Sequence, residues 1–376
     1  MSAPMPDAET TRVRLAKWLE DNIAGWRDVA LAPVELQHGS GWSADIFFID
    51  VSYRDDRGPQ ERGLVVRRQG DSFDLVLGGD LEFQSKMLAA LTRVGHLPVP
   101  EYIGMEPSSE LLGAPFLIME RVPGRAATQK PNYNLEGWLT ELNPGQRFDV
   151  WRNGIRAFAE LHKLDWRDGF GFLDRPERGE PGLEQYVNYL REWYQWAARG
   201  RDIPIVQAAL DHVIENRPSS AATSVLWGDP TPFNTMYNPD GTVASLIDWE
   251  LAALGPGEID LAWWLYFDEL FSEGFGIERL AGLPDRDQTI RLYEEAVGRQ
   301  VEHMDYYDIL TGLRMGIVAI RQFDRQVDLG NIPADNKSLT DNQMTVYLAK
   351  KLGMAVPELG PDFAAFVANL TPVEEE

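Results

Sequence analysis

One segment interrupts a largely helical stretch of the sequence and limits what the chain can fold into. It reads VLWGDPTPFNTMYNPDGTVASLIDWE, from Val225 to Glu250. SVLWGD is an apolar strand that ends at a glycine and a carboxylate, and NPDG is a turn sequence that joins TMY to VASLID as a tight hairpin. The hairpin folds Asp248 back towards Asn234 and Asp229. The sequence therefore predicts that these three polar side chains converge on one cavity.

The rest of the chain predicts a sheet-containing part followed by a mainly helical part. The first part contains a helix over 10–26, two antiparallel strands in SADIFFIDVSY and GLVVRRQ, a helix in DLEFQSKMLAALTRV and a buried strand in APFLIMERV. Helical periodicity is strong over 146–163, 183–199, 285–299 and 306–327. The expected fold class is α+β, with a small antiparallel-sheet lobe over residues 1–122 and a larger, mainly helical lobe over residues 123–376.

The composition excludes several classes of function. The 376 residues contain no cysteine, so a disulfide framework, a zinc–thiolate site and a cysteine nucleophile are ruled out. A formal charge of −24 repels phosphate backbones, and we expect no nucleic-acid partner. The N-terminal residues do not read as a signal peptide, and no apolar run approaches the length of a membrane span. We expect a cytoplasmic protein without a membrane partner, and the oligomeric state stays open.

The three polar residues of the central segment suit phosphoryl transfer. Mg²⁺ takes oxygen ligands, often one or two carboxylates together with nucleotide phosphates, and Asn234 and Asp248 supply such oxygens. Asp229 can accept a hydrogen bond from a substrate hydroxyl and orient it towards a phosphoryl group. The spacing Asp-x-x-x-x-Asn is that of the kinase catalytic loop. The alternative is that Asp229 and Asn234 only cap turns, and the hairpin that carries a second aspartate favours the functional interpretation.

The stretch WGDPTPFNTMYNPDGTVASLIDWELAALGPGEIDLAWWL resembles the core of the aminoglycoside phosphotransferase (choline kinase-like) family. Within that family it resembles the subgroup related to the kinase-like domain of acyl-CoA dehydrogenase family proteins. The subgroup pattern is His-Gly-Asp, four residues, Asn, then Asp-Trp-Glu and a later Asp-Leu-Ala-Trp. The resemblance covers most of the chain. It implies a two-lobed protein-kinase-like fold, with Mg²⁺ and ATP between the lobes and a small molecule with a hydroxyl group as acceptor.

Carried over by position, the resemblance gives each residue of the segment a role. Asp229 would be the catalytic aspartate, and Asn234 and Asp248 would hold Mg²⁺. Asp260, in EIDLAWW, would brace the catalytic loop by hydrogen bonds. Glu250 could contact the metal through water or be a solvated or buried partner, and both remain open.

Trp227 departs from the family pattern, which has histidine at that position. An indole cannot accept a hydrogen bond, so we expect this loop to be braced by packing instead. The departure leaves a second hypothesis open, in which the protein is a nucleotide-binding module with weak or no transferase activity.

Two segments resemble the family's phosphate-binding elements. Ser40, Gly41 and Ser43 precede the first strand of the hairpin, where small residues let backbone N–H groups approach phosphates. Arg67, in LVVRRQG, stands at the position of the kinase lysine and would hold the α- and β-phosphates. Alternation along the strand places Arg67 and Arg68 on opposite faces, and the alternative is that both are surface groups.

The remaining nucleotide contacts are predicted less directly. We expect Glu82 to be the helical partner of Arg67, with Gln84 as the alternative occupant of that position. FLIMERVPG resembles the hinge between lobes, so backbone groups near Glu120 and Val122 would contact the adenine edge.

The evidence for other kinds of active site is weaker in this sequence. His162, in FAELHKLD, is expected to be a packed or capping residue rather than a base. We find no His-Glu-x-x-His, Gly-x-Ser-x-Gly or Walker A sequence. The aromatic residues of YVNYLREWYQWAARG have helical spacing, which is typical of core, although in the family this region covers the acceptor site. The candidates for that pocket are Tyr186, Tyr189, Trp193 and Trp196. The identity of the acceptor stays open, as does ATP against GTP.

Overall fold

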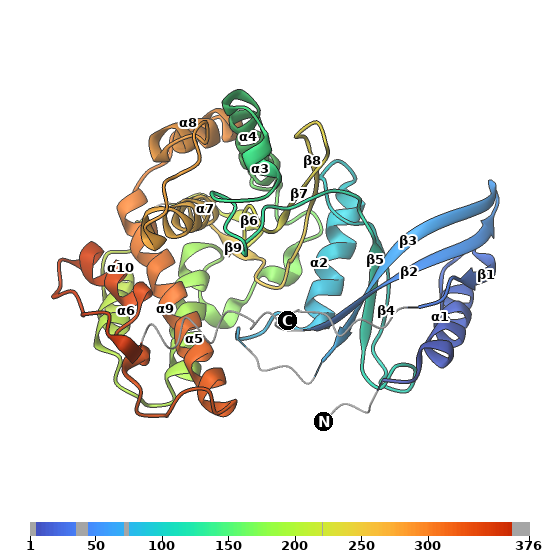
Figure 1. Ribbon diagram of the computed structural model, residues 1–376, viewed down its shortest axis with the longest axis horizontal. Helices are drawn as coiled ribbons and strands as arrows, with labels where there is room; N and C mark the ends of the chain where they lie inside the picture. The colour runs from blue at the N-terminus through green and yellow to red at the C-terminus, as the bar shows by residue number, and fades with distance from the viewer. Residues whose placement is uncertain (1–4, 35–43, 71–74, 220, 363–376) are drawn as a thin grey trace. The chain divides into compact units, whose positions relative to one another are not determined.

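The structure is a computed structural model that describes residues 5–34, 44–70, 75–219 and 221–362 (Figure 1). Contacts between residues divide the chain into two compact units. We name them the sheet unit, from segments 1–74, 78–126 and 234–250, and the helical unit, from segments 75–77, 127–233 and 251–376. The second segment of the sheet unit thus runs past Val122, the predicted boundary, to Ala126. The segment 234–250 joins the sheet unit although it follows a long stretch of the helical unit.

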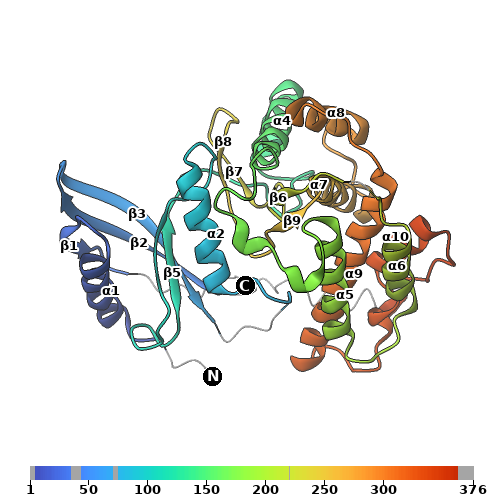
Figure 2. The ribbon, with the colours of Figure 1, turned by 180° about the vertical axis from the view of Figure 1, so that it is seen from behind.

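The sheet unit contains a five-stranded antiparallel sheet in the order β1-β2-β3-β5-β4. Its elements are α1 (Ala8–Asn22), β1 (Arg27–Leu31), β2 (Ala44–Asp55), β3 (Gly58–Gln69), α2 (Leu81–Val94), β4 (Tyr102–Glu106) and β5 (Phe116–Glu120). Figures 1 and 2 show α1 beside β1 and β2, and α2 along β5. The two predicted helices and three predicted strands are confirmed, whereas β1 and β4 were not predicted.

Alternation along β2 and β3 decides which side chains face the core of the sheet unit. The two strands pair along their whole length, from Ala44 opposite Gln69 to Asp55 opposite Gly58. One face buries apolar side chains of both strands against α1; the members of this core include Leu15, Trp18, Leu19, Phe47, Ile49, Val51, Leu64 and Val66. Because successive side chains point to opposite faces, Arg67 lies on the face away from this core.

The predicted hairpin is formed by β7 (Thr235–Tyr237) and β8 (Val243–Leu246). Its turn is closed by the N–H of Asn238 on the carbonyl of Thr242, at 2.8 Å, and Gly241 takes a positive φ of 83°. Asp240 accepts hydrogen bonds from the Thr242 hydroxyl and backbone N–H, and these bonds lower the pKa of its carboxyl. Local turn chemistry therefore fixes the hairpin.

Backbone bonds attach the hairpin to the rest of the sheet unit. Tyr237 and Arg125 exchange N–H···O bonds of 2.9 and 3.0 Å. The N–H of Leu246 donates to the carbonyl of Pro98 at 2.8 Å. A segment from late in the sequence thus becomes a fixed part of the sheet unit.

The helical unit is built mainly from α-helices. They are α3 (Trp138–Glu141), α4 (Pro144–Leu161), α5 (Leu183–Ala198), α6 (Pro204–Glu215), α7 (Glu258–Phe271), α8 (Arg286–Val297), α9 (Met304–Asp328) and α10 (Gln343–Leu352). Two short strands, β6 (Ser224–Leu226) and β9 (Ala253–Gly255), pair antiparallel. The four helices predicted from periodicity are confirmed as α4, α5, α8 and α9. The α+β class is confirmed as well.

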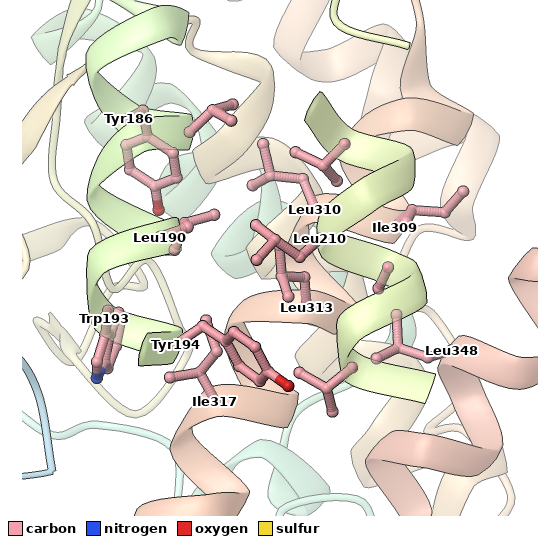
Figure 3. Packing of buried hydrophobic residues seen from close by; sticks show 14 of the residues in the cluster. Tyr186, Leu190, Trp193, Tyr194, Leu210, Ile309, Leu310, Leu313, Ile317 and Leu348 are labelled. Carbon is pink, nitrogen blue, oxygen red and sulfur yellow. The ribbon is translucent and has the colours of Figure 1, made fainter. Parts of the chain in front are cut away.

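The core of the helical unit lies among α5, α6, α9 and α10, and Figure 3 shows their side chains interdigitating. Residues such as Leu190, Leu210, Leu310 and Leu313 are buried there. The helix α7 is different because almost all of its residues are buried, on every side. Nevertheless, none of the helices in the described part of the chain has the length and apolar character needed to cross a bilayer.

This packing predicts the effect of truncating a core leucine. Leu310→Ala removes a fully buried side chain and should lower the free energy of unfolding by about 2–5 kcal/mol, because it loses apolar burial and leaves a cavity. Leu329→Ala is the matched control, since Leu329 at the end of the same helix is 61% exposed, and should cost less than about 0.5 kcal/mol. Denaturant unfolding followed by circular dichroism measures both. Equal losses would contradict the assigned core.

Candidate functional site

The predicted site residues are divided between the two units. Asp229 belongs to the helical unit, and the other described ones belong to the sheet unit. Those in the sheet unit are Arg67, Glu82, Glu120, Val122, Asn234 and Asp248. The predicted phosphate loop with Ser40, Gly41 and Ser43 lies outside the described residues. We therefore build the site one unit at a time.

In the sheet unit, Arg67 lies against two carboxylates of the central segment. Its Nη2 donates to Glu250 Oε2 at 2.9 Å and its Nη1 to Asp248 Oδ1 at 3.4 Å. Arg67 is buried, whereas Asp248 is partly exposed. Arg68, on the other face of the strand, donates to the carbonyl of Leu112 and to Asp45. Both arginines are therefore buried groups with different roles.

The hairpin brings Asn234 and Asp248 together through the backbone. The N–H of Ile247 donates to the carbonyl of Asn234 at 3.0 Å, immediately before Asp248. Asp248 itself has a positive φ of 63°, a conformation that aspartate tolerates better than most residues. Such backbone conformations persist only where the surroundings impose them, and they concentrate at functional sites. The hairpin alone therefore brings the backbones of Asn234 and Asp248 close together.

The side chains of this cluster suit a hard divalent cation. Asn234 offers an amide oxygen and Asp248 a carboxylate, which are ligands that Mg²⁺ accepts alongside water and phosphate oxygens. Asp248 and Glu250 together carry two negative charges against the single positive charge of Arg67. Among the described residues, no group of three or more His, Cys, Asp or Glu side chains could hold a metal alone. Asn234 and Asp248 are thus the residues of this cluster whose side-chain types fit Mg²⁺.

The helical partner predicted for Arg67 must be corrected. Glu82 lies in the first turn of α2, where its exposed carboxylate pairs with Lys86 one turn along the helix, at 2.6 Å. Gln84 points inwards instead and donates to the carbonyl of Gly79 at 2.7 Å. Glu250, from the central segment, is the carboxylate that pairs with Arg67. Of the two interpretations of Glu250, the structure supports the one in which it is a partner group, here partly buried and bonded to Arg67.

The hinge residues differ in the state of their backbone N–H groups. Glu120 ends β5, and its N–H already donates to the carbonyl of Glu101 at 2.9 Å. Arg121 donates to the carbonyl of Gly63 at 3.0 Å. The N–H of Val122 has no acceptor within the part of the chain that the structure describes. Of the two residues predicted for adenine contact, Val122 is therefore the better donor.

In the helical unit, a buried carboxylate holds the start of the predicted catalytic loop. Asp260 of α7 accepts the N–H of Trp227 at 2.8 Å and the N–H of Gly228 at 3.1 Å. His162 Nε2 contacts the same carboxylate at 3.0 Å. Asp260 and Trp227 are fully buried. The predicted bracing role of Asp260 is confirmed, and the loop is held by polar bonds to its backbone in addition to the packing of Trp227.

His162 is a structural partner of Asp260. Its Nδ1 lies 2.8 Å from the hydroxyl of Tyr293. Burial raises the pKa of Tyr293 well above its usual value, so this hydroxyl keeps its proton. The two ring nitrogens of His162 thus each have one buried polar partner, Asp260 at Nε2 and Tyr293 at Nδ1. A Cβ at Gly257 would overlap that hydroxyl, so only glycine leaves room for the pair.

Asp229 directly follows Trp227 and Gly228, and its carboxylate accepts a hydrogen bond from an indole. Trp263 Nε1 donates to Asp229 Oδ1 at 2.6 Å. Asp229 is partly exposed, whereas Trp263 is buried in α7. Three residues farther on, the carbonyl of Pro232 accepts the N–H of Ala127 at 3.1 Å. The loop therefore has fixed points before and after its carboxylate.

Sequence reasoning missed Trp263 and the part that His162 plays. The spacing of Asp260 and Trp263, three residues apart on one helix, was a usable signal because such positions share a face. The histidine contact joins segments far apart in the chain and left no local signal. Of the aromatic residues predicted to line an acceptor pocket, Tyr186 and Trp193 are buried in the helical core, and Tyr189 donates to the carbonyl of Leu77.

The turn that precedes Asp229 predicts a strict requirement for glycine. Gly228 has a φ of 89°, and a Cβ there would overlap the carbonyl oxygen of Leu251. Gly228→Ala should therefore destabilise the helical unit by more than the roughly 1–2 kcal/mol of a left-handed conformation alone. Gly200→Ala is the matched control, because Gly200 has a φ of 78° and a Cβ added there would meet no atom within 4 Å. Thermal unfolding of both variants measures the difference, and equal midpoints would contradict the close approach.

The chain resembles known proteins in sequence and in structure. Acyl-CoA dehydrogenase family member 11 of Pongo abelii is 22% identical over 353 residues, which is 90% of this chain and 42% of that protein. The chain thus spans about two-fifths of the length of this relative. A Ralstonia eutropha protein assigned to the aminoglycoside phosphotransferases matches with a TM-score of 0.67 at 20% identity, covering 91% of this chain and 98% of that one.

A second solved structure is a thermostable mutant of aminoglycoside phosphotransferase APH(4)-Ia in ternary complex with ADP and hygromycin B. It matches with a TM-score of 0.53 at 14% identity, over 90% of this chain and 98% of that one. These likenesses confirm the predicted protein-kinase-like fold. A family model described as "Phosphotransferase enzyme family" matches residues 34–292. Because this match covers more than half of the 376 residues, the chain belongs to the phosphotransferase enzyme family.

Proposed function

We propose that the protein transfers the γ-phosphoryl group of ATP to a hydroxyl group of a small molecule. The observation that carries this proposal is how the segment from Trp227 to Asp248 is fixed at both ends. Asp260 holds its start in the helical unit, and the backbone bond between Ile247 and Asn234 holds its end in the sheet unit. Preorganised polar groups of this kind are what phosphoryl transfer requires, since positioning and charge stabilisation supply most of the catalysis.

Each residue of the segment then has a separate role. Asp229 orients the acceptor hydroxyl and accepts its proton as the hydroxyl oxygen bonds to the γ-phosphorus and the bond to the β-phosphate oxygen breaks, which releases ADP. Asn234 and Asp248 hold Mg²⁺, which neutralises charge on the phosphates when bound. Arg67 donates to phosphate oxygens, and Glu250 keeps the guanidinium in place through its 2.9 Å bond.

The comparisons support a nucleotide and a small molecule as substrate classes, but they do not identify the acceptor. The APH(4)-Ia complex contains ADP and hygromycin B, which suggests a nucleotide and a small molecule as the two substrate classes for this chain. A formal charge of −24 favours a cationic acceptor over an anionic one by long-range attraction. The acidic cluster of Asp248 and Glu250 would draw Mg²⁺ in the same way.

Replacing the catalytic aspartate tests the proposed role of Asp229. Asp229→Asn keeps the shape of the side chain but removes the proton acceptor, and kcat should fall by about 10²–10⁴-fold. Nucleotide affinity, measured by calorimetry, should stay within about twofold, because ATP binding is assigned to other residues. Asp335→Asn, at an exposed position of the helical unit outside the segment, is the control and should leave both unchanged. Full turnover by Asp229→Asn would refute the assignment.

Removing the metal tests the role assigned to the hairpin. Chelation with EDTA should abolish transfer, and added Mg²⁺ should restore it, because the phosphate charges are otherwise uncompensated. Asp248→Asn should raise the Mg²⁺ concentration needed for half-maximal rate by at least about tenfold, since one ligand charge is lost. Transfer that persists in EDTA would contradict the metal site. Nucleotide binding without product from a broad panel of hydroxyl compounds would favour a binding module instead.

A further inference from the structure

We propose that Trp263 and Arg314 are positioning residues for Asp229, with the buried cation of Arg314 strengthening the hydrogen bond that Trp263 donates to the carboxylate. This inference deepens the proposed function, on which its kinetic part rests. All three residues belong to the helical unit, so the geometry does not depend on the other unit.

The first step is the bond between the indole and the carboxylate. Trp263 Nε1 lies 2.6 Å from Asp229 Oδ1, which is short for an N–H donor and typical of a bond to a charged acceptor. An indole donates but cannot accept, so this contact favours the ionised carboxylate. The ring of Trp263 is buried, and α7 holds it at a fixed place relative to Asp260 three residues earlier.

The second step is the cation on the indole face. The guanidinium carbon of Arg314, from α9, lies 3.5 Å from the centroid of the Trp263 ring. Arginine stays charged at every accessible pH, and its side chain here is 1% exposed. A cation on the π face is attracted by the ring and withdraws electron density from it, which makes the indole N–H a stronger donor. Low surrounding polarity enlarges this effect.

The third step concerns the other contacts that Arg314 makes among the described residues. Nη1 of Arg314 has one long contact, 3.4 Å to the hydroxyl of Tyr186, a residue whose place among the core side chains Figure 3 shows. Its Nε and Nη2 are buried and have no hydrogen-bond partner among the described residues. No carboxylate in the described part of the chain forms an ion pair with it either.

A buried guanidinium in this state does not stabilise the fold. Removing such a charge from water is unfavourable, and paired carboxylates normally offset that cost. Other buried arginines here are paired in this way, as Arg321 is with Asp324 at 3.0 Å. Arg314 lacks this compensation, and its near neighbour through the indole is the carboxylate of Asp229. A role in positioning Asp229 accounts for the buried charge of Arg314, which the stability of the fold does not explain.

The direct test reads the Trp263 indole proton by NMR in protein labelled with ¹⁵N-tryptophan. The signal is identified by its loss in Trp263→Phe. In Arg314→Met, which keeps an unbranched side chain without charge, the indole proton should move upfield because its hydrogen bond weakens. Arg314→Lys should retain part of the downfield shift. Arg321→Met is the matched control, because Arg321 is on the same helix as Arg314, α9, and its guanidinium carbon lies 4.2 Å from the centroid of a different indole, that of Trp196.

Kinetics give the second readout. In Arg314→Met, kcat should fall by about tenfold while KM for ATP changes by less than about twofold, since the effect is on the acceptor side. Arg314→Lys should recover part of kcat, and Arg321→Met should stay near the wild type. If Arg314→Met does not fold, Arg314→Gln, which is also uncharged, carries the same comparison.

The outcomes separate the two proposals. An indole signal unchanged in both Arg314 variants would overturn the coupling, whatever the activity. A shifted signal with kcat unchanged in an active enzyme would overturn the positioning role. A wild type without any transfer, together with a shifted signal, would refute the proposed function and the positioning role with it, while the coupling between cation and indole would stand.

Discussion

The carboxylate of Asp260 is the interaction on which the rest of the site depends. It is fully buried, and its oxygens accept two backbone N–H groups and contact a histidine ring. A buried charge is tolerated only with such a set of donors, so the loop, α7 and His162 must assemble together. Because the donors are backbone groups, the side chain at position 227 is free to be tryptophan. The loop that leads to Asp229 is fixed without the histidine that the family pattern places there.

From this point the chain carries functional groups into both units. Asp229 remains in the helical unit, whereas Asn234 and Asp248 become part of the sheet unit through the hairpin and its bonds to Pro98 and Arg125. The arrangement separates the group proposed to act on the acceptor from those proposed to act on the metal and phosphates. A single segment of sequence thereby links the two compact units through the residues that the proposed reaction needs.

Much of the architecture could be predicted because its signals are local. Alternation identified β2 and β3, the NPDG turn identified the hairpin, and helical periodicity identified α5 and α9. The strands β1 and β4 have five residues each and lie at the edges of the sheet, where few apolar positions mark them. The helix α7 is apolar on nearly every side, so it shows little of the periodicity that reveals a surface helix.

For the candidate site, the sequence predicted which residues to examine but not what they contact. Residue types and spacing pointed to Asp229, Asn234, Asp248 and the bracing Asp260. The partners of these groups come from distant segments: Glu250 pairs with Arg67 where Glu82 was expected, and Trp263 and His162 hold the two aspartates of the helical unit. Such pairings depend on tertiary structure, and one sequence carries no record of them.

The most direct measurement follows the phosphoryl group itself. The chain is incubated with Mg²⁺ and ATP labelled with ¹⁸O in the γ-phosphoryl group, together with a panel of hydroxyl compounds that includes amines, sugars and hydroxyacyl compounds, and the products are analysed by mass spectrometry. The account predicts a phosphate ester that carries the intact labelled group on one acceptor class, with ADP formed in equal amount. Bound nucleotide with the label remaining in ATP, or released only as inorganic phosphate, would contradict it.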